Sequence, residues 1–122
     1  MRTGLAFSAV LVLSGLVAKP GFAAEVKAGV YDVKGTNFDG SSYTGTARIK
    51  ISSNTTCRIV WKTGGTESSG ICMRDEDSFA AAYKLGNSVG LVIYKINDDG
   101  SLEGVWTIAD KSGAGTETLT PQ

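Results

Sequence analysis

Two short motifs of identical pattern constrain the fold of this chain more than any other feature of its sequence. Asn37-Phe38-Asp39-Gly40-Ser41 and Asn97-Asp98-Asp99-Gly100-Ser101 both read Asn-x-Asp-Gly-Ser. Three-residue hairpin loops combine a type I turn with a residue in the left-handed conformation, which glycine adopts without steric cost. Each motif therefore predicts a β-hairpin, centred on Asp39 in the first case and on Asp99 in the second.

Further tight turns are expected at Gly64-Gly65, at Gly86-Asn87 and around Asn54. Between the turns apolar and polar residues alternate, so one set of side chains can be buried while the other stays in water. The expected strands cover residues 29–35, 42–52, 56–63, 66–74, 78–85, 88–97, 101–109 and 114–120. This order predicts an all-β, eight-stranded antiparallel up-and-down meander. Closure into a barrel would remove its exposed edges, while a twisted open meander or a small sandwich is the alternative.

The turns also fix which residues face each other across the hairpins. Centring one hairpin on the glycines at 64 and 65 pairs Lys62 with Glu67 on the outer side. The same register pairs Cys57 with Cys72 on the inner side. The other turns predict these pairs: Gly35 with Tyr43, Val33 with Gly45, Tyr31 with Ala47, Ala47 with Trp61, Tyr83 with Gly90, Val92 with Trp106, and Tyr94 with Gly104. Aromatic side chains thus repeatedly meet glycine or alanine, which suits a narrow, strongly curved interior.

The first residues predict a cleavable signal peptide. Arg2 precedes an uncharged run over residues 5–17 that is too short to span a bilayer. Small residues at 21 and 23 place the expected cleavage after Ala23. We therefore expect residues 1–23 to be the signal peptide and residues 24–122 to form one β-barrel domain. Without a membrane anchor after cleavage, this domain would be periplasmic or secreted.

Cys57 and Cys72 are the two cysteines of the chain, and export makes a disulfide between them the expected state. Opposed residues in antiparallel strands lie about 4.5–5.5 Å apart at Cα, which is within disulfide range. A domain of this size has a marginal core, so a covalent link would stabilise it. A free reactive thiol is the alternative.

The composition argues against several classes of function. Without Arg2 and Lys19 the 12 basic residues fall to 10 against 12 acidic ones, so the mature chain offers no electrostatic basis for binding nucleic acid. The chain has no histidine, the commonest general base and metal ligand. Phosphate-loop and dinucleotide-binding motifs do not occur. We therefore expect a protein that is not an enzyme, with no catalytic residue, cofactor or metal site.

Carboxylates are the remaining candidates for chemistry. Asp75-Glu76-Asp77 lies between two expected strands, and Asp98-Asp99 lies in a hairpin turn. Calcium takes several oxygen ligands, but these spacings match no known calcium loop, and solvated turns are the favoured interpretation. A hydrolase that uses two loop carboxylates is accordingly the weakest functional hypothesis.

Large side chains are expected to fill the interior. The inward aromatic residues are Tyr31, Tyr43, Trp61, Phe79, Tyr83, Tyr94 and Trp106, and all except Phe79 are candidate ligand-facing residues. The inward aliphatic residues are Val33, Ile49, Ile51, Ile59, Val92, Ile96, Leu102 and Ile108. The aromatic rings could grip a planar or apolar ligand, but an eight-stranded barrel is narrow enough for side chains alone to fill it. We expect Gly35, Gly45, Gly90 and Gly104 to lie under aromatic neighbours, the interior to be closed, and any cavity to open near Ala81.

The sequence resembles a known group of proteins. The matching residues are Tyr31, Val33, Gly35, Asn37, Asp39-Gly40-Ser41, Tyr43, Gly45, Trp61, Gly70-Ile71, Tyr94, Asp99-Gly100-Ser101-Leu102, Gly104, Trp106, Gly115-Thr116-Glu117 and Leu119. This pattern covers nearly the whole mature chain and is similar to small exported bacterial β-barrel proteins of largely undefined function, some labelled fibronectin-binding. The architecture is also similar to avidin-like and lipocalin-like barrels, whose ligand motifs are not matched here.

These observations support a main functional hypothesis and an alternative. The main one is an exported, non-enzymatic barrel that binds a protein or another macromolecular partner through its surface or rim. The alternative is a carrier of a small apolar ligand in the barrel mouth, which a pocket of about a few hundred Å³ would favour.

Overall fold

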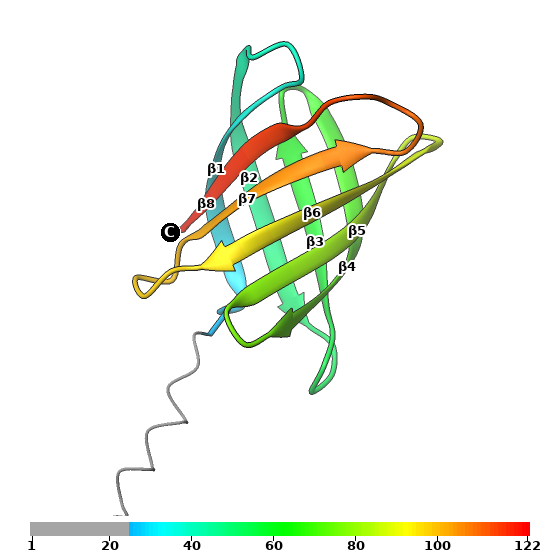
Figure 1. The fold of residues 1–122 in the computed structure, drawn as a ribbon. Coiled ribbons are helices and arrows are strands. Elements are labelled where there is room, and N and C mark those ends of the chain that lie inside the picture. Colours follow the sequence, from blue (N-terminus) through cyan, green and yellow to red (C-terminus); the bar gives the residue numbers. More distant parts are fainter. Residues whose placement is uncertain (1–24) are drawn as a thin grey trace, which may run out of the picture.

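Eight antiparallel strands follow one another around a closed barrel in the computed structural model, which describes residues 25–122 (Figure 1). The strands are β1 (Gly29–Thr36), β2 (Ser42–Ile51), β3 (Cys57–Thr63), β4 (Thr66–Asp75), β5 (Ser78–Leu85), β6 (Ser88–Ile96), β7 (Leu102–Ile108) and β8 (Gly115–Pro121). Their bounds agree with the predicted ones to within one residue. Because β8 pairs with β1, no strand of this barrel has an open edge.

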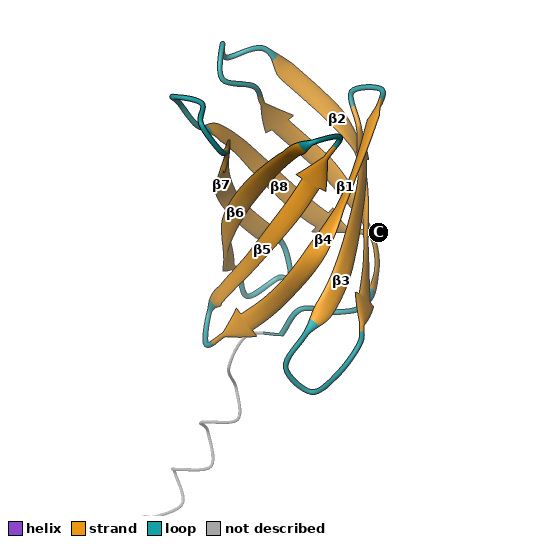
Figure 2. Cartoon of the chain, turned by 90° about the vertical axis from the view of Figure 1, so that its right-hand side faces the viewer, coloured by secondary structure: helices purple, strands orange, loops and turns teal. Residues whose placement is uncertain are grey.

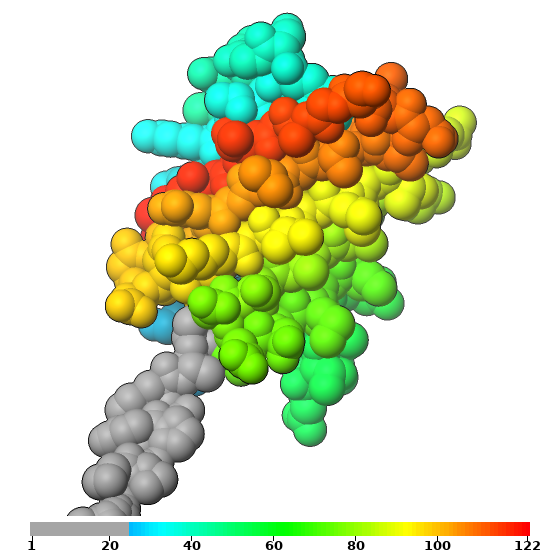
Figure 3. Space-filling view, viewed as in Figure 1, coloured from blue at the N-terminus to red at the C-terminus, as the bar shows by residue number. Residues whose placement is uncertain are grey.

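The loops gather at the two ends of the barrel (Figure 2). In the space-filling view the side chains of neighbouring strands close the wall between them (Figure 3). Within residues 25–122 no helix is long and apolar enough to cross a membrane. The predicted signal peptide, residues 1–23, lies outside the described residues.

The two Asn-x-Asp-Gly-Ser motifs form turns of the same geometry. In the first, the Asn37 N–H donates to the Ser41 carbonyl at 2.8 Å, and Gly40 has a φ of 88°, in the left-handed region. The Ser41 N–H and hydroxyl both donate to the Asp39 carboxylate, at 2.9 and 2.6 Å, and these bonds lower the pKa of Asp39. The same bonds recur in the second motif, residues 97–101. The prediction of two matching hairpins is therefore confirmed.

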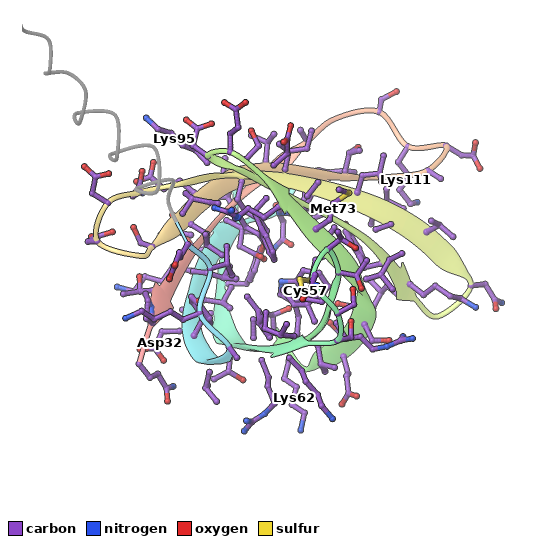
Figure 4. The ribbon with its side chains drawn as sticks, turned by 90° about the horizontal axis from the view of Figure 1, so that it is seen from below. Asp32, Cys57, Lys62, Met73, Lys95 and Lys111 are labelled. Carbon is purple, nitrogen blue, oxygen red and sulfur yellow. A yellow bond between two sulfur atoms is a disulfide. The ribbon has the colours of Figure 1, made fainter. Side chains whose placement is uncertain are left out.

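Every residue pair that the turns predict is present in the barrel. Cys57 and Cys72 form a disulfide between β3 and β4, with their Cα atoms 5.0 Å apart. Figure 4 looks along the barrel and shows Cys57 inside the ring of strands and Lys62 outside it. The disulfide indicates an oxidising environment, such as a periplasm or the cell exterior.

The core fills one end of the barrel. The largest fully buried side chains are Tyr31, Tyr94, Phe79, Ile49, Ile59, Leu102, Leu119 and Val33. The segment before β1 covers this end, because the Tyr31 hydroxyl donates to the Lys27 carbonyl at 2.6 Å and accepts from the Lys27 N–H at 3.1 Å. Val26 of the same segment packs against the core. We call this the closed end.

The inward glycines serve two different kinds of close packing. A Cβ atom on Gly90 would lie 2.2 Å from the ring of Tyr83, so this glycine makes room for a side chain. A Cβ atom on Gly104 would instead lie 2.1 Å from the backbone carbonyl oxygen of Ile93. The same two situations recur at Gly35, under Tyr43, and at Gly45, beside the Lys62 carbonyl. The prediction that all four lie under aromatic rings is therefore wrong for Gly45 and Gly104, where two backbones approach each other.

One residue predicted to point into the interior is exposed. Ile51 has 52% of its surface accessible. It is the last residue of β2, so it lies at the rim of the closed end, beyond the packed core. The alternation along β2 directs its side chain inward, but at the rim no other side chains bury it.

Candidate functional site

A cavity of about 330 Å³ lies at the end of the barrel opposite the closed end. Its lining residues are Asn37, Tyr43, Trp61, Thr63, Gly64, Thr66, Ser68, Tyr83, Leu85, Val92, Trp106, Ile108 and Glu117. The prediction of a filled, closed interior is therefore wrong for this half of the barrel. The largest fully buried aliphatic side chains lie towards the closed end, whereas the tip of the β3–β4 hairpin lines the cavity with small residues: Thr63, Gly64, Thr66 and Ser68.

The cavity does not open at Ala81, where the sequence led us to expect it. Ala81 is buried, and it pairs with Cys72 on one side and Val92 on the other. Its partner Cys72 is joined to Cys57 by the disulfide. Of Ala81 and Val92, only Val92 lines the cavity.

Four of the six candidate ligand-facing aromatic residues line the cavity: Tyr43, Trp61, Tyr83 and Trp106. The rings of Trp61 and Tyr83 meet edge to face with centroids 5.3 Å apart, and those of Tyr43 and Trp106 do so at 6.3 Å. The other two candidates, Tyr31 and Tyr94, are each 1% exposed and belong to the core. The structure thus divides the predicted set between the wall of the cavity and the packing beneath it.

Close packing holds two of the wall rings in place. Tyr83 lies over Gly90, and its hydroxyl donates to the Thr107 carbonyl at 2.9 Å. Trp106 lies over Gly115 and stacks on Phe38 of the β1–β2 loop, with ring centroids 4.9 Å apart. Each of these rings therefore packs against the backbone of a glycine on one side, and both line the cavity.

A buried glutamate, Glu117, lies between the cavity and the core and is 7% exposed. Its Oε1 accepts a hydrogen bond from the Tyr43 hydroxyl at 2.7 Å. Its Oε2 accepts from the Trp61 indole N–H at 2.9 Å and from the Tyr94 hydroxyl. An indole N–H can only donate, so three donors converge on this carboxyl, which is the arrangement that satisfies its ionised form.

Sequence reasoning missed Glu117 as a site residue. The available signal was the alternation of β8, in which Gly115, Glu117 and Leu119 share the inward face. A search for inward apolar residues passes over a carboxylate at such a position. Its three donors come from β2, β3 and β6, which only the closed barrel brings together.

Burial and the charge of Glu117 change the acid–base behaviour of nearby tyrosines. Burial first, and the Glu117 charge second, raise the pKa of Tyr43 and of Tyr94 well above the ordinary tyrosine value. The same two causes raise the pKa of Tyr83 to about 12. The three hydroxyls therefore stay protonated at neutral pH and act as hydrogen-bond donors.

The loop carboxylates lie far from this cavity along the barrel. Asp75-Glu76-Asp77 spans the β4–β5 turn, and Asp98-Asp99 lies in the β6–β7 turn, both at the closed end. Among residues 25–122, no group of three or more histidine, cysteine, aspartate or glutamate side chains could hold a metal ion. Asp99 instead accepts hydrogen bonds from Ser101 within its own turn.

A second hollow, of about 380 Å³, lies on the outer face of the barrel over β3 to β6. Exposed residues such as Arg58, Ser69, Ile71 and Lys84 surround it. None of the described residues that line this hollow is both charged and buried, whereas the first cavity contains the buried Glu117. The interior cavity with Glu117 is therefore the stronger candidate site.

Comparisons with known proteins relate the chain to others by fold alone. No family model matches the sequence, and no curated protein does. A redesigned β-barrel, mFAP1 bound to DFHBI, has a TM-score of 0.68 at 22% identity and covers 80% of this chain and 97% of its own. A de novo designed fluorescence-activating β-barrel has a TM-score of 0.65 at 16% identity, covering 82% and 97%. A mutant of the fluorescent protein UnaG has a TM-score of 0.51 at 11% identity, covering 78% and 95%.

None of these matches bears on the fibronectin-binding label carried by some proteins of the group that the sequence resembles. At such low identities the matches establish the architecture and leave the family open. The chain has the closed β-barrel fold of these proteins.

Proposed function

We propose that this protein binds a small apolar or planar ligand in the cavity at the open end of the barrel. The observation that carries the proposal is a cavity of about 330 Å³ with four aromatic rings in its wall and a buried carboxylate beneath them. Small-molecule sites occupy about 300–1,000 Å³ and combine apolar walls with a few polar groups. One solved structure of this fold, mFAP1, is bound to a small molecule, DFHBI. These points favour the carrier alternative over the main hypothesis of the sequence analysis.

The wall chemistry indicates what kind of body the ligand has. Besides the rings, Leu85, Val92 and Ile108 line the cavity. Apolar surface buried against such a wall contributes about 25 cal/mol per Å². The hydroxyls of Thr63 and Ser68 near the mouth offer weak polar contacts. A flat, mostly apolar molecule therefore fits the site best.

We propose that the ligand is bound without chemical conversion. Glu117 is the one carboxylate among the described residues that line the cavity, and three donors already hold it. Hydrolysis by paired carboxylates needs a second such group within about 5–10 Å across the substrate. Turnover assays with chromogenic ester and glycoside substrates should give rates indistinguishable from buffer, and measurable turnover lost in Glu117→Gln would contradict this.

Intrinsic fluorescence tests the binding proposal at the site itself, because Trp61 and Trp106 are the two tryptophans of the chain and both line the cavity. We expect N-phenyl-1-naphthylamine, a neutral aromatic fluorophore, to quench their emission saturably with one-to-one stoichiometry. Ser68→Phe should abolish this binding by filling the cavity. Glu67→Phe is the matched control, because the neighbouring side chain is exposed and outward on the same strand. Equal binding by both variants, or quenching without saturation, would contradict the proposal.

A second candidate function, binding of a macromolecular partner, is favoured by the outer face of β4 to β7. Five large apolar side chains there are 51–59% exposed: Ile71, Met73, Leu91, Ile93 and Val105. Met73, Ala80, Ile93 and Val105 form one row across the four strands, so these side chains adjoin. The surface of β5 to β7 is continuous in Figure 3. Apolar patches of a few hundred Å² commonly mark interaction sites.

The partner we propose for this face is a second copy of the chain, because the mature domain carries almost no net charge to keep copies apart. Sedimentation of the mature protein should show a concentration-dependent dimer. Ile93→Lys should abolish it, whereas Thr120→Lys, on the outer face of β8, should leave it intact. A protein that stays monomeric at every concentration would exclude the second copy as occupant.

A further inference from the structure

The cavity has a negative charge beneath it with no positive partner in its wall. Glu117 is one of the described residues that line the cavity. None of these lining residues is a lysine or an arginine. A buried carboxylate needs hydrogen-bond donors or a cation. An ionised carboxylate offers about four acceptor positions, and three are taken by Tyr43, Trp61 and Tyr94. A ligand in the cavity can therefore supply the next donor.

The aromatic wall also favours a positively charged ligand. Trp61, Tyr83, Tyr43 and Trp106 line the space next to this carboxylate. The faces of aromatic rings are electrostatically negative and attract cations, most strongly where water is excluded. An anionic ligand would place a second negative charge near Glu117 in a poorly screened site, and the two would repel each other.

We infer that the cavity selects a small organic cation: a protonated amine or amidinium carried on a planar apolar body. The N–H groups of the cation donate to Glu117, and the body lies between the Trp61–Tyr83 pair and the Tyr43–Trp106 pair. This inference rests on the proposed function, since it names the class of ligand for the same cavity. The cavity lies near the lower limit for small-molecule sites, which favours a compact body of about two or three aromatic rings.

Three probes with one ring system and different charge test the inference on the unmodified mature protein. They are naphthalen-2-ylmethylamine, which is protonated at neutral pH, the neutral naphthalen-2-ylmethanol and the anionic 2-naphthoate. Titration calorimetry should show the amine binding about 10- to 100-fold more tightly than the alcohol, because the ammonium forms an ion pair with Glu117 and is attracted by the ring faces, whereas the alcohol donates only an uncharged O–H group. The naphthoate should bind most weakly.

The failures of the two proposals can be told apart. If the alcohol binds as tightly as the amine, or the naphthoate binds best, the preference for a cation is wrong while the small-ligand site stands. If none of the three binds and N-phenyl-1-naphthylamine does not bind either, both proposals are wrong. Binding of that neutral fluorophore alone overturns only the preference for a cation.

Glu117→Gln isolates the contribution of the charge. The glutamine carbonyl can still accept from Trp61 and Tyr94, and its N–H₂ can donate to the Tyr43 hydroxyl, so the variant should fold. Its affinity for the amine should fall about 10- to 100-fold, whereas its affinity for the alcohol should fall by a smaller factor, because the glutamine carbonyl still offers an acceptor. Glu67→Gln removes an exposed, outward carboxylate and should bind all probes as the original chain does. An unchanged preference for the amine in Glu117→Gln would overturn the inference.

Discussion

Glu117 is a carboxylate on the inward face of β8. Its neighbours on that face are Gly115, which has no side chain, and the apolar Leu119. The barrel tolerates this charge because the hydroxyl and indole groups of surrounding aromatic side chains donate to it. Those side chains bring both apolar area and a polar tip. The same residues can therefore line an apolar cavity and satisfy the one charge beneath it.

Two glycines with similar positions in the sequence pattern should respond differently to the same substitution. Gly104→Ala places a methyl group against the backbone carbonyl of Ile93, which cannot move without shifting a strand, and should destabilise the protein by about 1–3 kcal/mol. Gly90→Ala meets the far end of the Tyr83 ring, which can move, and should cost less. Chemical denaturation measures both. A larger loss for Gly90→Ala would show that Tyr83 is held more rigidly than the backbone.

Alternation predicts which side chains point inward but not what surrounds them. Tyr43 and Tyr94 share the inward face, yet one lines the cavity and the other is 1% exposed in the core. Ile51 follows the same alternation and lies on the rim. The difference depends on depth along the barrel, which is fixed by strand tilt and by the packing of all strands together.

At the scale of elements, the twin turns offer a matched comparison. Asp39 and Asp99 accept the same hydrogen bonds from Ser41 and Ser101. Ser101 is 8% exposed, whereas Ser41 is exposed. Asp99→Ala leaves polar groups of a buried serine short of a partner, while water can replace the lost bonds at Ser41. Thermal denaturation should show the larger loss of melting temperature for Asp99→Ala. Equal losses would show that water reaches both turns.

The disulfide should contribute substantially to the stability of the β3–β4 hairpin and of the barrel. It joins residues separated by 15 positions, for which loop-closure entropy predicts about 3 kcal/mol. The double variant Cys57→Ala/Cys72→Ala should lose about this amount in urea denaturation. Reduction of the original protein with dithiothreitol is the control, because it breaks the link without deleting the sulfur atoms. A loss below about 1 kcal/mol in both cases would contradict the chain-entropy account.

The pairing of strands could be predicted because tight turns leave little freedom. A two- or three-residue loop fixes the offset between its strands, and a slip by one residue would turn every side chain to the other face. The Cys57–Cys72 bond followed from the turn at 64 and 65 in this way. The cavity could not be predicted by the same route, because it depends on the summed volumes of side chains from several strands. The small residues of the β3–β4 hairpin lower that sum at one end only.

At the scale of the whole molecule, the barrel has two unlike ends. The segment before β1, the disulfide and the largest buried side chains occupy the closed end, from which Figure 4 views the barrel. The other end contains the aromatic wall, Glu117 and the cavity mouth. Stability and binding are therefore carried by different halves of one sheet. Substitutions at the mouth, such as Ser68→Phe, can change binding with little effect on the core.

The closed barrel as a whole should control the ionisation of tyrosine. The chain has four tyrosines, Tyr31, Tyr43, Tyr83 and Tyr94, and burial is the first cause that raises the pKa of each in the folded protein. A folded-state pKa above the unfolded value of about 10 means that the folded form holds its protons more tightly. The resulting stability is fully present below about pH 10. It is lost as the pH rises towards the folded-state values, the pKa of Tyr83 being about 12.

We therefore expect the protein to unfold in base before its tyrosines ionise. Tyrosinate absorption should increase in one cooperative step above about pH 10, together with the loss of the β-sheet circular dichroism signal. The same protein in concentrated urea is the control and should titrate gradually around pH 10, as free tyrosine does. In Glu117→Gln the loss of a negative charge should lower the pKa of Tyr83 and bring its ionisation closer to the ordinary value. Ionisation of two or more tyrosines while the circular dichroism remains native would show that water enters the aromatic wall more freely than this structure allows.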